Sequence, residues 1–371
     1  MRVIISAAGT GGHINPGIAI ANKIKEKEPD SKIIFIGTNR GLENDLVPRA
    51  GYELKIIEAY GLKKEFSLSN FKHIFQTFKS SKTVKKIIDE FKPDVVIGTG
   101  GYICGPVFAA ALSRKIPTVL HESNAYPGKA VKMFSKNVDL VLAGFEEAKT
   151  RLVDCKKVVV TGTPTKIRKI NVDSLRKKEI LKELGIRNDL PILLVFGGSQ
   201  GAQAINEAVF DMITKKLNKN YQIVWAAGQK QYDTIKENFE KQNMYISSLG
   251  NVKVLPYIYN MEEMLNIADL IVCRSGAMTI TEIAIVGKPA IFIPLPSQSA
   301  NRQEDNARVL EKIGAAKIIL NKDLTAERLS EEINDIILKK SELDEMGKLA
   351  NRIAPYEVEE KIYNEIKKVV K

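Results

Sequence analysis

The sequence predicts an α/β protein built from two doubly wound domains, each with a parallel sheet. Short apolar strands alternate with helical segments along both halves of the 371 residues, as in parallel sheets covered by helices. The alternation pauses in a charged stretch after residue 163, and a glycine-rich turn follows the first strand of each half. We therefore expect one domain over residues 1–163 and a second over residues 164–353. A terminal helix over about 354–371 is expected to cross back to the first domain.

Composition and charge indicate two buried cores and an anionic partner. The chain is 44% hydrophobic, and no stretch approaches the roughly eighteen continuous apolar residues of a membrane span. Three widely spaced cysteines (Cys104, Cys155 and Cys273) and the lack of a signal peptide favour a reduced, cytoplasmic protein. Residues 1–163 hold 25 Lys and Arg against 16 Asp and Glu, a net charge of +9. This excess favours a phosphate-bearing ligand, an acidic membrane surface or nucleic acid near the first domain.

Short β-branched runs define the expected strands. In the first domain they cover residues 3–7, 32–37, 54–58, 95–98, 118–121, 140–143 and 158–161. In the second they cover residues 191–196, 222–226, 252–255, 269–273, 290–294 and 317–320, after a helix over about 173–184. The terminal helix is expected to begin at Pro355 and to carry one apolar stripe, made of Val358, Ile362, Ile366 and Val369.

The second domain contains the sharpest signal of a binding site. A buried strand is followed by Ser275-Gly276 and by a predicted helix over residues 277–286, which ends at Gly287. The N–H groups and the dipole at the start of such a helix bind anions. Glu282, roughly 9 Å along the helix at about 1.5 Å per residue, is placed to accept hydrogen bonds from both ribose hydroxyls of a nucleotide. An ordinary strand–helix–strand unit with a surface glutamate is the alternative.

Each half also begins with a strand that runs into a glycine-rich turn, at residues 8–16 and 196–201. Neither turn is the GxGxxG dinucleotide motif or a Walker loop. Their glycines still let a ligand approach the backbone, and Ser199 adds a hydroxyl for a phosphate oxygen. Ligands of doubly wound sheets bind outside the carboxyl ends of the strands. We therefore expect two facing glycine turns to enclose a substrate.

Few residues are suited to acid–base chemistry. His13 follows three glycines in the first turn, where a neutral imidazole could take a proton from an attacking sugar hydroxyl. Glu122 is a second candidate base, and Asn124 could bond an amide or hydroxyl; His121 beside them could merely fix its loop. No Cys/His cluster and no Asp-x-Asp pair suggests a metal, so loop amides and basic groups would stabilise a diphosphate.

The segment from residue 63 to residue 86 is basic and amphipathic. Apolar residues on one helical face, Phe71, Ile74, Phe75 and Phe78, accompany lysines that include Lys72 and Lys79. This pattern resembles an interfacial membrane anchor. The alternative is a crossover helix that packs into the sheet, as expected for its second half with Val84, Ile87, Ile88 and Phe91. A second basic stretch at residues 129–136 could share the surface, whereas no motif for nucleic acid accompanies the charge.

Together these motifs resemble those of the MurG family of bacterial glycosyltransferases, over nearly the whole chain. Each motif alone is weak, but the ordered set is highly specific. The resemblance is carried by Gly9-Thr10-Gly11-Gly12-His13 with Pro16, Gly37-Thr38 with Gly41-Leu42-Glu43, Gly100-Gly101-Tyr102, His121-Glu122 with Asn124, Gly197-Gly198-Ser199-Gln200-Gly201, Cys273-Arg274-Ser275-Gly276-Ala277 with Thr279 and Glu282, and Arg302-Gln303 with Asn306-Ala307.

The resemblance implies a GT-B fold, in which two Rossmann-like domains face each other across a cleft, with the donor mostly on the second. It implies inverting transfer of N-acetylglucosamine from UDP-N-acetylglucosamine to the 4-hydroxyl of N-acetylmuramic acid in undecaprenyl-diphospho-N-acetylmuramoyl-pentapeptide (lipid I). The product would be lipid II for peptidoglycan synthesis, and no cofactor is expected. It also implies a peripheral protein on the cytoplasmic face of an anionic cell membrane, with other cell-wall enzymes as candidate partners and no nucleic acid.

The resemblance also assigns residues by position. The main chain of Ile258 is assigned to uracil, Glu282 to the ribose and Gln303 to the sugar. His13 is the favoured base, with Glu122 as the alternative. The full donor-binding set is Thr10, Gly11, Gly12, Asn124, Lys166, Ser199, Ile258, Ala277, Met278, Thr279, Ile280, Thr281, Glu282 and Gln303.

Two positions depart from the family pattern. Ser123 stands where the family usually has Gln, so one amide is lost. Lys166 stands where the family usually has Arg after the domain junction, which keeps the charge but loses the planar fork. Arg168 is the alternative source of that contact. Two other functions remain open on the same architecture: a transferase acting on diacylglycerol, and a UDP-sugar 2-epimerase, which would need no acceptor.

Overall fold

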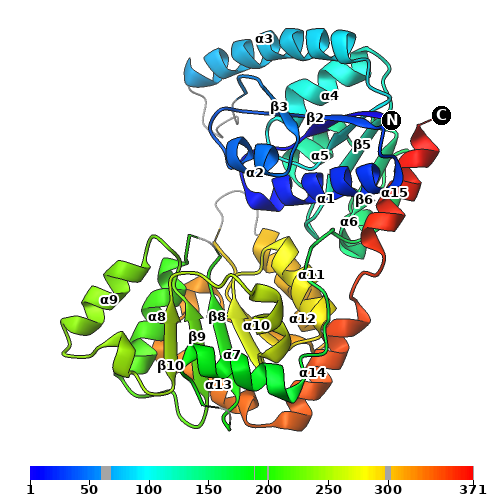
Figure 1. The fold of residues 1–371 in the computed structure, drawn as a ribbon. Coiled ribbons are helices and arrows are strands. Elements are labelled where there is room, and N and C mark those ends of the chain that lie inside the picture. The colour runs from blue at the N-terminus through cyan, green and yellow to red at the C-terminus, as the bar shows by residue number, and fades with distance from the viewer. Residues whose placement is uncertain (60–67, 188, 199, 297–301, 371) are drawn as a thin grey trace. The chain divides into compact units, whose positions relative to one another are not determined.

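The structure is a computed structural model that describes residues 1–59, 68–187, 189–198, 200–296 and 302–370, with the backbone alone over residues 68–79. The described chain forms two compact units (Figure 1). Unit 1 comprises Met1–Thr165 together with Pro355–Lys371, and unit 2 comprises Lys166–Ala354. No helix of the described residues is both long enough and apolar enough to span a membrane.

Unit 1 is built on a parallel sheet of seven described strands in the order β3-β2-β1-β4-β5-β6-β7. The strands are β1 (Arg2–Ser6), β2 (Lys32–Gly37), β3 (Glu53–Ile56), β4 (Val95–Gly98), β5 (Thr118–Glu122), β6 (Leu140–Ala143) and β7 (Val158–Val160). The helices are α1 (Gly11–Lys27), α2 (Glu43–Arg49), α3 (Leu68–Phe91), α4 (Cys104–Ser113), α5 (Lys129–Phe134), α6 (Glu146–Thr150) and α15 (Val358–Val369).

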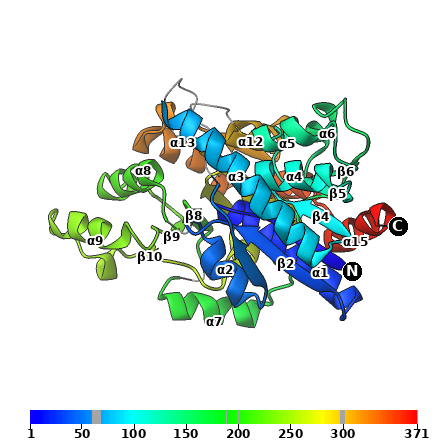
Figure 2. The same cartoon turned by 90° about the horizontal axis from the view of Figure 1, so that it is seen from above.

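Helices cover both faces of this sheet, because side chains alternate between the faces along each strand. Val3 and Ile5 point to a core shared with α1, α2 and α15, whereas Ile4 points to a core shared with α3, α4 and α5. Helix α15 lies beside α1 in both views (Figures 1 and 2). Its predicted stripe packs there as expected, with Val358, Ile362 and Ile366 buried and Val369 at the margin.

The second half of α3 packs into the sheet as predicted. Val84 and Ile88 are buried in the core, and Ile87 and Phe91 pack against it. The side chains of Phe71, Lys72, Ile74, Phe75, Phe78 and Lys79, which form the predicted membrane face, lie outside the described residues. Their proposed role therefore stays a prediction from the sequence.

Unit 2 repeats the architecture with a parallel sheet of six described strands in the order β10-β9-β8-β11-β12-β13. The strands are β8 (Ile192–Phe196), β9 (Gln222–Ala226), β10 (Val252–Leu255), β11 (Leu270–Cys273), β12 (Ala290–Phe292) and β13 (Ala316–Ile318). The helices are α7 (Ser174–Leu184), α8 (Gln203–Thr214), α9 (Tyr232–Glu240), α10 (Met261–Ile267), α11 (Ala277–Val286), α12 (Arg302–Lys312), α13 (Ala326–Ile337) and α14 (Lys340–Arg352), with short 3₁₀ turns η1 (Ile246–Ser248) and η2 (Asn321–Asp323).

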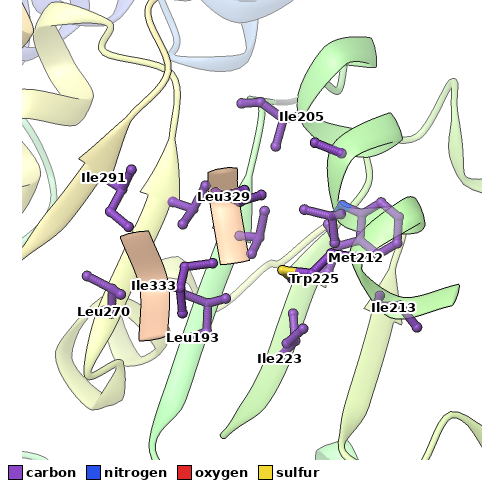
Figure 3. Packing of buried hydrophobic residues seen from close by; sticks show 14 of the residues in the cluster. Leu193, Ile205, Met212, Ile213, Ile223, Trp225, Leu270, Ile291, Leu329 and Ile333 are labelled. Carbon is purple, nitrogen blue, oxygen red and sulfur yellow. The ribbon is translucent and has the colours of Figure 1, made fainter. Parts of the chain in front are cut away.

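A core of large apolar side chains joins one face of this sheet to α8 and α13 (Figure 3). Trp225 from β9 is fully buried there, and its indole N–H donates to Asn206 Oδ1 at 2.9 Å. Asn206 in turn donates to the carbonyl of Ala227 at 2.8 Å and to Gln231 at 2.7 Å. The indole N–H of Trp225 and the side-chain amide of Asn206 are thus satisfied, and the first turns of α8 are tied to the loop after β9.

Most predicted strands and helices are found, with bounds that differ by a few residues. The predicted start of the terminal helix is wrong. The helix begins at Val358 rather than Pro355. Pro355 packs against Gly162, where an added Cβ would lie 2.3 Å from the proline ring, and Glu357 adopts a left-handed conformation with φ 53°. The chain therefore turns once more before it can enter the helix.

In each sheet the strand order reverses at one point, between β1 and β4 in unit 1 and between β8 and β11 in unit 2. Neighbouring loops leave the sheet in opposite directions at such a point, which opens a crevice at the carboxyl ends of the strands. Both glycine-rich turns lie at these points, since one follows β1 and the other follows β8.

Candidate active site

Helix α11 has the bounds and the open N-terminus that the anion site predicted in unit 2 needs. Its bounds, Ala277–Val286, and its left-handed cap at Gly287, with φ 68°, match the prediction. Gly276 is the N-cap, and the first hydrogen bond of the helix joins Ile280 N–H to Gly276 O at 3.0 Å. The N–H groups of Ala277, Met278 and Thr279 precede it, so no carbonyl of the helix can accept them. They are suited to bind the oxygens of a diphosphate.

The side chains of α11 divide into a buried face and a half-buried face. Met278, Thr279 and Glu282 are half-buried and lie on one face at helical spacing, as the predicted ribose contact requires. Ile280 is buried in the core, and the Thr281 hydroxyl donates to Ala277 O at 3.0 Å. Both residues belong to the predicted donor set, but the side chain of Ile280 packs in the core and that of Thr281 bonds its own helix.

A pocket of about 470 Å³ opens at the carboxyl end of the unit 2 sheet. It receives residues from the loops after four strands, β8, β11, β12 and β13, and from the starts of α8 and α12. Its lining is Gly197, Gly201, Ala202, Gln203, Ala204, Glu207, Arg274, Leu295, Pro296, Gln303 and Asn321. Among the predicted site residues, Gln303 lies in this pocket, whereas Ser199 lies outside the described residues.

Two turns beside the pocket are fixed by contacts that sequence patterns do not reveal. The side-chain oxygen of Gln303 accepts a hydrogen bond from Leu295 N–H at 2.9 Å, and its main-chain oxygen accepts one from the Ser275 hydroxyl at 2.8 Å. Ser275 is fully buried. Its hydroxyl, which the sequence placed in the phosphate turn, therefore connects α11 to α12.

Arg274 is a pocket residue to which sequence reasoning assigned no role. Its Nη1 donates to Ile293 O at 2.9 Å, to Pro294 O at 3.1 Å and to Asn321 Oδ1 at 2.8 Å, which ties together the ends of β11, β12 and β13. Burial lowers the pKa of this guanidinium, which stays charged. The position of Arg274 directly after a strand could have identified it as a site residue from the sequence. No sequence signal could have identified Asn321, because it contacts Arg274 from a different loop.

In unit 1 the first glycine turn is shorter than predicted. The turn ends at Thr10, an exposed N-cap, and Gly11, Gly12 and Pro16 lie inside α1. Gly9 adopts φ +96°, which requires glycine. The N–H groups of Gly11 and Gly12 occupy the first two helical positions, where the helix offers them no acceptor. They form a second place where an anionic substrate group can bind.

The imidazole of His13 is held in one orientation by the loop after β4. Its Nδ1 lies 3.1 Å from Thr99 O, while the Thr99 hydroxyl donates to His13 O at 2.6 Å. Because a carbonyl oxygen can only accept, Nδ1 carries the proton and Nε2 keeps its lone pair in the neutral ring. A Cβ at Gly100 would lie 2.4 Å from Nδ1, so glycine is required there. The geometry suits a general base that acts through Nε2.

Glu122, the alternative candidate base, is held by hydrogen bonds from its own loop. Its Oε1 accepts from the main-chain N–H of Asn124 at 2.8 Å and from the side-chain amide at 2.9 Å, and its Oε2 accepts from Gly128 N–H at 2.5 Å. Only 4% of Glu122 is exposed. Three donors thus fix the carboxylate, which holds the loop that leads into α5 in place.

His121 has the structural role that the sequence left open. It is fully buried, its Nε2 lies 3.2 Å from Gly162 O, and the Ser123 hydroxyl lies 3.4 Å from its Nδ1. Burial lowers its pKa to about 4, so it is neutral near pH 7. Ser123, which departs from the family pattern, therefore contacts this histidine.

The remaining predicted contacts lie at loop positions. Ile258 is buried between two exposed tyrosines, Tyr257 and Tyr259, whose rings lie 5.0 Å apart edge to face. Lys166 is exposed, and Arg168 nearby donates its main-chain N–H to Glu262 at 2.8 Å. Within the described parts of the chain, no group of three or more His, Cys, Asp or Glu side chains is placed to hold a metal ion.

Comparison with known proteins agrees with this arrangement. Residues 3–143 match the glycosyltransferase family 28 N-terminal domain, and residues 192–362 match the C-terminal domain of the same family. A protein of Acetivibrio thermocellus named UDP-N-acetylglucosamine--N-acetylmuramyl-(pentapeptide) pyrophosphoryl-undecaprenol N-acetylglucosamine transferase is 43% identical, over 100% of this chain and 99% of its own.

Solved structures show the same fold. The crystal structure of Acinetobacter baumannii MurG has a TM-score of 0.79 and 27% identity, with 99% of each chain covered. A UDP-GlcNAc 2-epimerase from Neisseria meningitidis has a TM-score of 0.64 at 17% identity, covers 99% of this chain and 100% of its own, and shares the fold alone. The fold is GT-B, and the chain belongs to glycosyltransferase family 28 and, within it, to the MurG family.

Proposed function

We propose that this chain transfers N-acetylglucosamine from UDP-N-acetylglucosamine to lipid I, which yields lipid II for peptidoglycan synthesis. The observation that carries the proposal is the match along the entire chain, at 43% identity, to a transferase named for that reaction. Two features described above support it, the N-terminus of α11 in unit 2, which is suited to a diphosphate, and the oriented imidazole of His13 in unit 1.

Unit 2 binds the donor in this proposal. The N–H groups of Ala277, Met278 and Thr279 hold the diphosphate, with Ser199 as a further donor. Glu282 accepts the ribose hydroxyls from the same half-buried face of α11. The main chain of Ile258 contacts uracil, Gln303 reads the sugar with Asn124, and Lys166 contacts the nucleotide. Preformed donors that cost no reorganisation suit a leaving group on which negative charge develops.

Unit 1 supplies the chemical step. His13 Nε2 takes the proton of the 4-hydroxyl as that oxygen attacks the anomeric carbon, and the bond to the UDP oxygen breaks with inversion. The Nδ1–H bond to Thr99 O stabilises the imidazolium that results. The N–H groups of Gly11 and Gly12, with Thr10, neutralise charge on a diphosphate. A general base of this kind contributes about 10² to 10⁴ in rate.

We further propose that the protein acts as a peripheral enzyme on the cytoplasmic face of the cell membrane. Lysines and apolar residues of the segment from residue 63 to residue 86 would contact the anionic surface. Helix α5 can contribute Met133, which is 64% exposed, beside Lys132, whose Nζ lies 3.9 Å from the centre of the Tyr126 ring.

The function is tested by offering radiolabelled UDP-N-acetylglucosamine with lipid I, with diacylglycerol or without an acceptor. We expect label on lipid I alone. Label on diacylglycerol would keep the fold and the donor site but make the protein a glycolipid synthase. Consumption of the donor without any acceptor would indicate an epimerase or a hydrolase. Either of these results would contradict the proposal.

A further inference from the structure

One motif of unit 1, Gly37-Thr38 with Gly41-Leu42-Glu43, has no part in the chemistry described so far. It follows β2 and leads into α2, of which Glu43 is the first residue. The side chain of Glu43 is fully buried, which is unusual for a carboxylate. A buried charge of this kind is stable only when hydrogen-bond donors replace its hydration.

The donors come from the glycine turn and from the end of β2. Glu43 Oε2 accepts the N–H of Gly9 at 2.9 Å. Its Oε1 accepts the N–H of Thr38 at 3.0 Å and the Thr38 hydroxyl at 2.7 Å. Burial alone would raise the pKa of Glu43, but these hydrogen bonds outweigh it and lower the pKa. The group is therefore an ionised carboxylate at neutral pH.

The same loop holds the other side of the Gly9 residue. The N–H of Leu42 donates to Gly9 O at 3.4 Å. Both polar groups of Gly9 are thus bound by consecutive residues of one loop. Gly9 directly precedes Thr10, which caps α1, so its position sets where Gly11, Gly12 and His13 begin the helix.

At two glycines of the motif, Gly37 and Gly41, the Glu43 side chain leaves no space for a Cβ atom. A Cβ at Gly41 would lie 1.9 Å from Glu43 Oε2, and a Cβ at Gly37 would lie 2.8 Å from its Cγ. The Thr38 hydroxyl also lies 3.4 Å from Tyr102 Oη, in the loop that contacts His13. The loops after β1, β2 and β4 are in this way joined around one carboxylate.

We propose that Glu43 is a positioning residue for the transfer reaction, whose carboxylate holds Gly9 and thereby fixes the turn that orients His13 and the N–H groups of Gly11 and Gly12. The inference rests on the proposed function and adds to it a residue that touches no substrate. The hydrogen bonds of Glu43 to Gly9 and Thr38 form a clasp that lies within unit 1. Because uracil, ribose and most of the diphosphate contacts are assigned to unit 2, loss of the clasp should lower turnover more than it weakens donor binding.

The test is Glu43→Gln in the full chain. Glutamine has the same shape, but its NH₂ group must face the main-chain N–H of either Gly9 or Thr38. Neither can accept a hydrogen bond, so at least one bond of the clasp breaks. We expect kcat to fall by about tenfold or more, because small displacements of reacting groups have large effects on rate, while KM for UDP-N-acetylglucosamine stays within about threefold. Hydrogen exchange of residues 8–13 should accelerate. Glu53→Gln, the same change at an exposed site on β3, should match the parent in all three.

The outcomes separate the possible failures. A kcat within about twofold of the parent, in protein that still binds UDP, would overturn the proposal. If Glu43→Gln does not fold, Thr38→Val decides, because it removes one donor and leaves the charge; Thr38→Ser is its control. Unchanged kcat in Thr38→Val together with unchanged exchange would overturn the proposal. Absence of transfer by the parent would contradict the proposed function instead, and the exchange measurement would still report on the clasp.

Discussion

Gly100→Ala should move the imidazole of His13 without touching any residue that binds the donor. The added Cβ would lie 2.4 Å from His13 Nδ1 and 2.7 Å from Cε1, and ordinary contact begins at 3.4 Å. The ring must therefore retreat by about 1 Å, and the bond from Nδ1 to Thr99 O, 3.1 Å long, is lost. A displacement of about 1 Å at a reacting group costs about 10²-fold in rate, or about 2.7 kcal/mol.

The assay is steady-state transfer to lipid I, with UDP binding measured by calorimetry. We expect kcat to fall by about 10²-fold and the affinity for UDP to stay at the parent value. Gly100 has φ +114°, so the variant should also lose about 1 to 3 kcal/mol of stability through backbone strain. Gly105→Ala is the matched control, since a Cβ at that helical glycine meets nothing within 4 Å.

Combining the change with His13→Ala distinguishes the mechanism. If Gly100→Ala acts through the imidazole, it should add little to the loss caused by His13→Ala, because substitutions on one path are not additive. A kcat within about threefold of the parent in folded Gly100→Ala would refute the assignment of His13 as the oriented base.

Three further predictions concern the donor, the C-terminal helix and the membrane. Glu282→Ala should weaken UDP binding by about 10- to 100-fold, the loss of charge-assisted hydrogen bonds, and an unchanged affinity in calorimetry would count against the ribose contact. Burial raises the pKa of Glu28, but hydrogen bonds, led by that from Lys367, lower it to about 2 from 4.5; the resulting stability is present above about pH 4.5 and is lost as the pH falls toward 2. Glu28→Gln should therefore flatten the melting temperature across that range, and an equally steep fall would contradict the account. The double variant Phe75→Ser and Phe78→Ser should no longer sediment with anionic vesicles. Undiminished sedimentation would indicate that these two side chains pack against the sheet instead of contacting the membrane.

Local sequence patterns were sufficient to predict helices, strands and turns, whose conformation depends on neighbouring residues in the chain. The strand before Ser275 and the helix that ends at Gly287 follow from a β-branched run and from a glycine that can adopt a left-handed conformation. The alternation of strands and helices predicts both sheets for the same reason. Each of these features depends on residues within one or two turns of the chain.

Contacts between distant loops were not predictable in this way. Glu43 appeared in the sequence only as part of a family motif with no assigned role, and its hydrogen bonds to Gly9 and Thr38 become visible only in the structure. Ser275 lies in a sequence typical of a phosphate-binding turn, yet its hydroxyl donates to the main-chain oxygen of Gln303 in α12. Pro355 is typical of a first helical position, but its packing on Gly162 delays the helix. In each case the partner lies far away in the sequence, where no spacing rule applies.

The most direct test of the account is single-turnover transfer to lipid I, followed by rapid quenching over a range of donor concentrations for the parent, His13→Ala and Glu282→Ala. We predict that His13→Ala slows transfer about 10²-fold even at saturating donor. Glu282→Ala should approach the parent rate once donor is saturating, with half the rate reached only at a higher concentration. Failure of the parent to form lipid II, or the same concentration dependence in both variants, would contradict the assignment of chemistry to unit 1 and donor binding to unit 2.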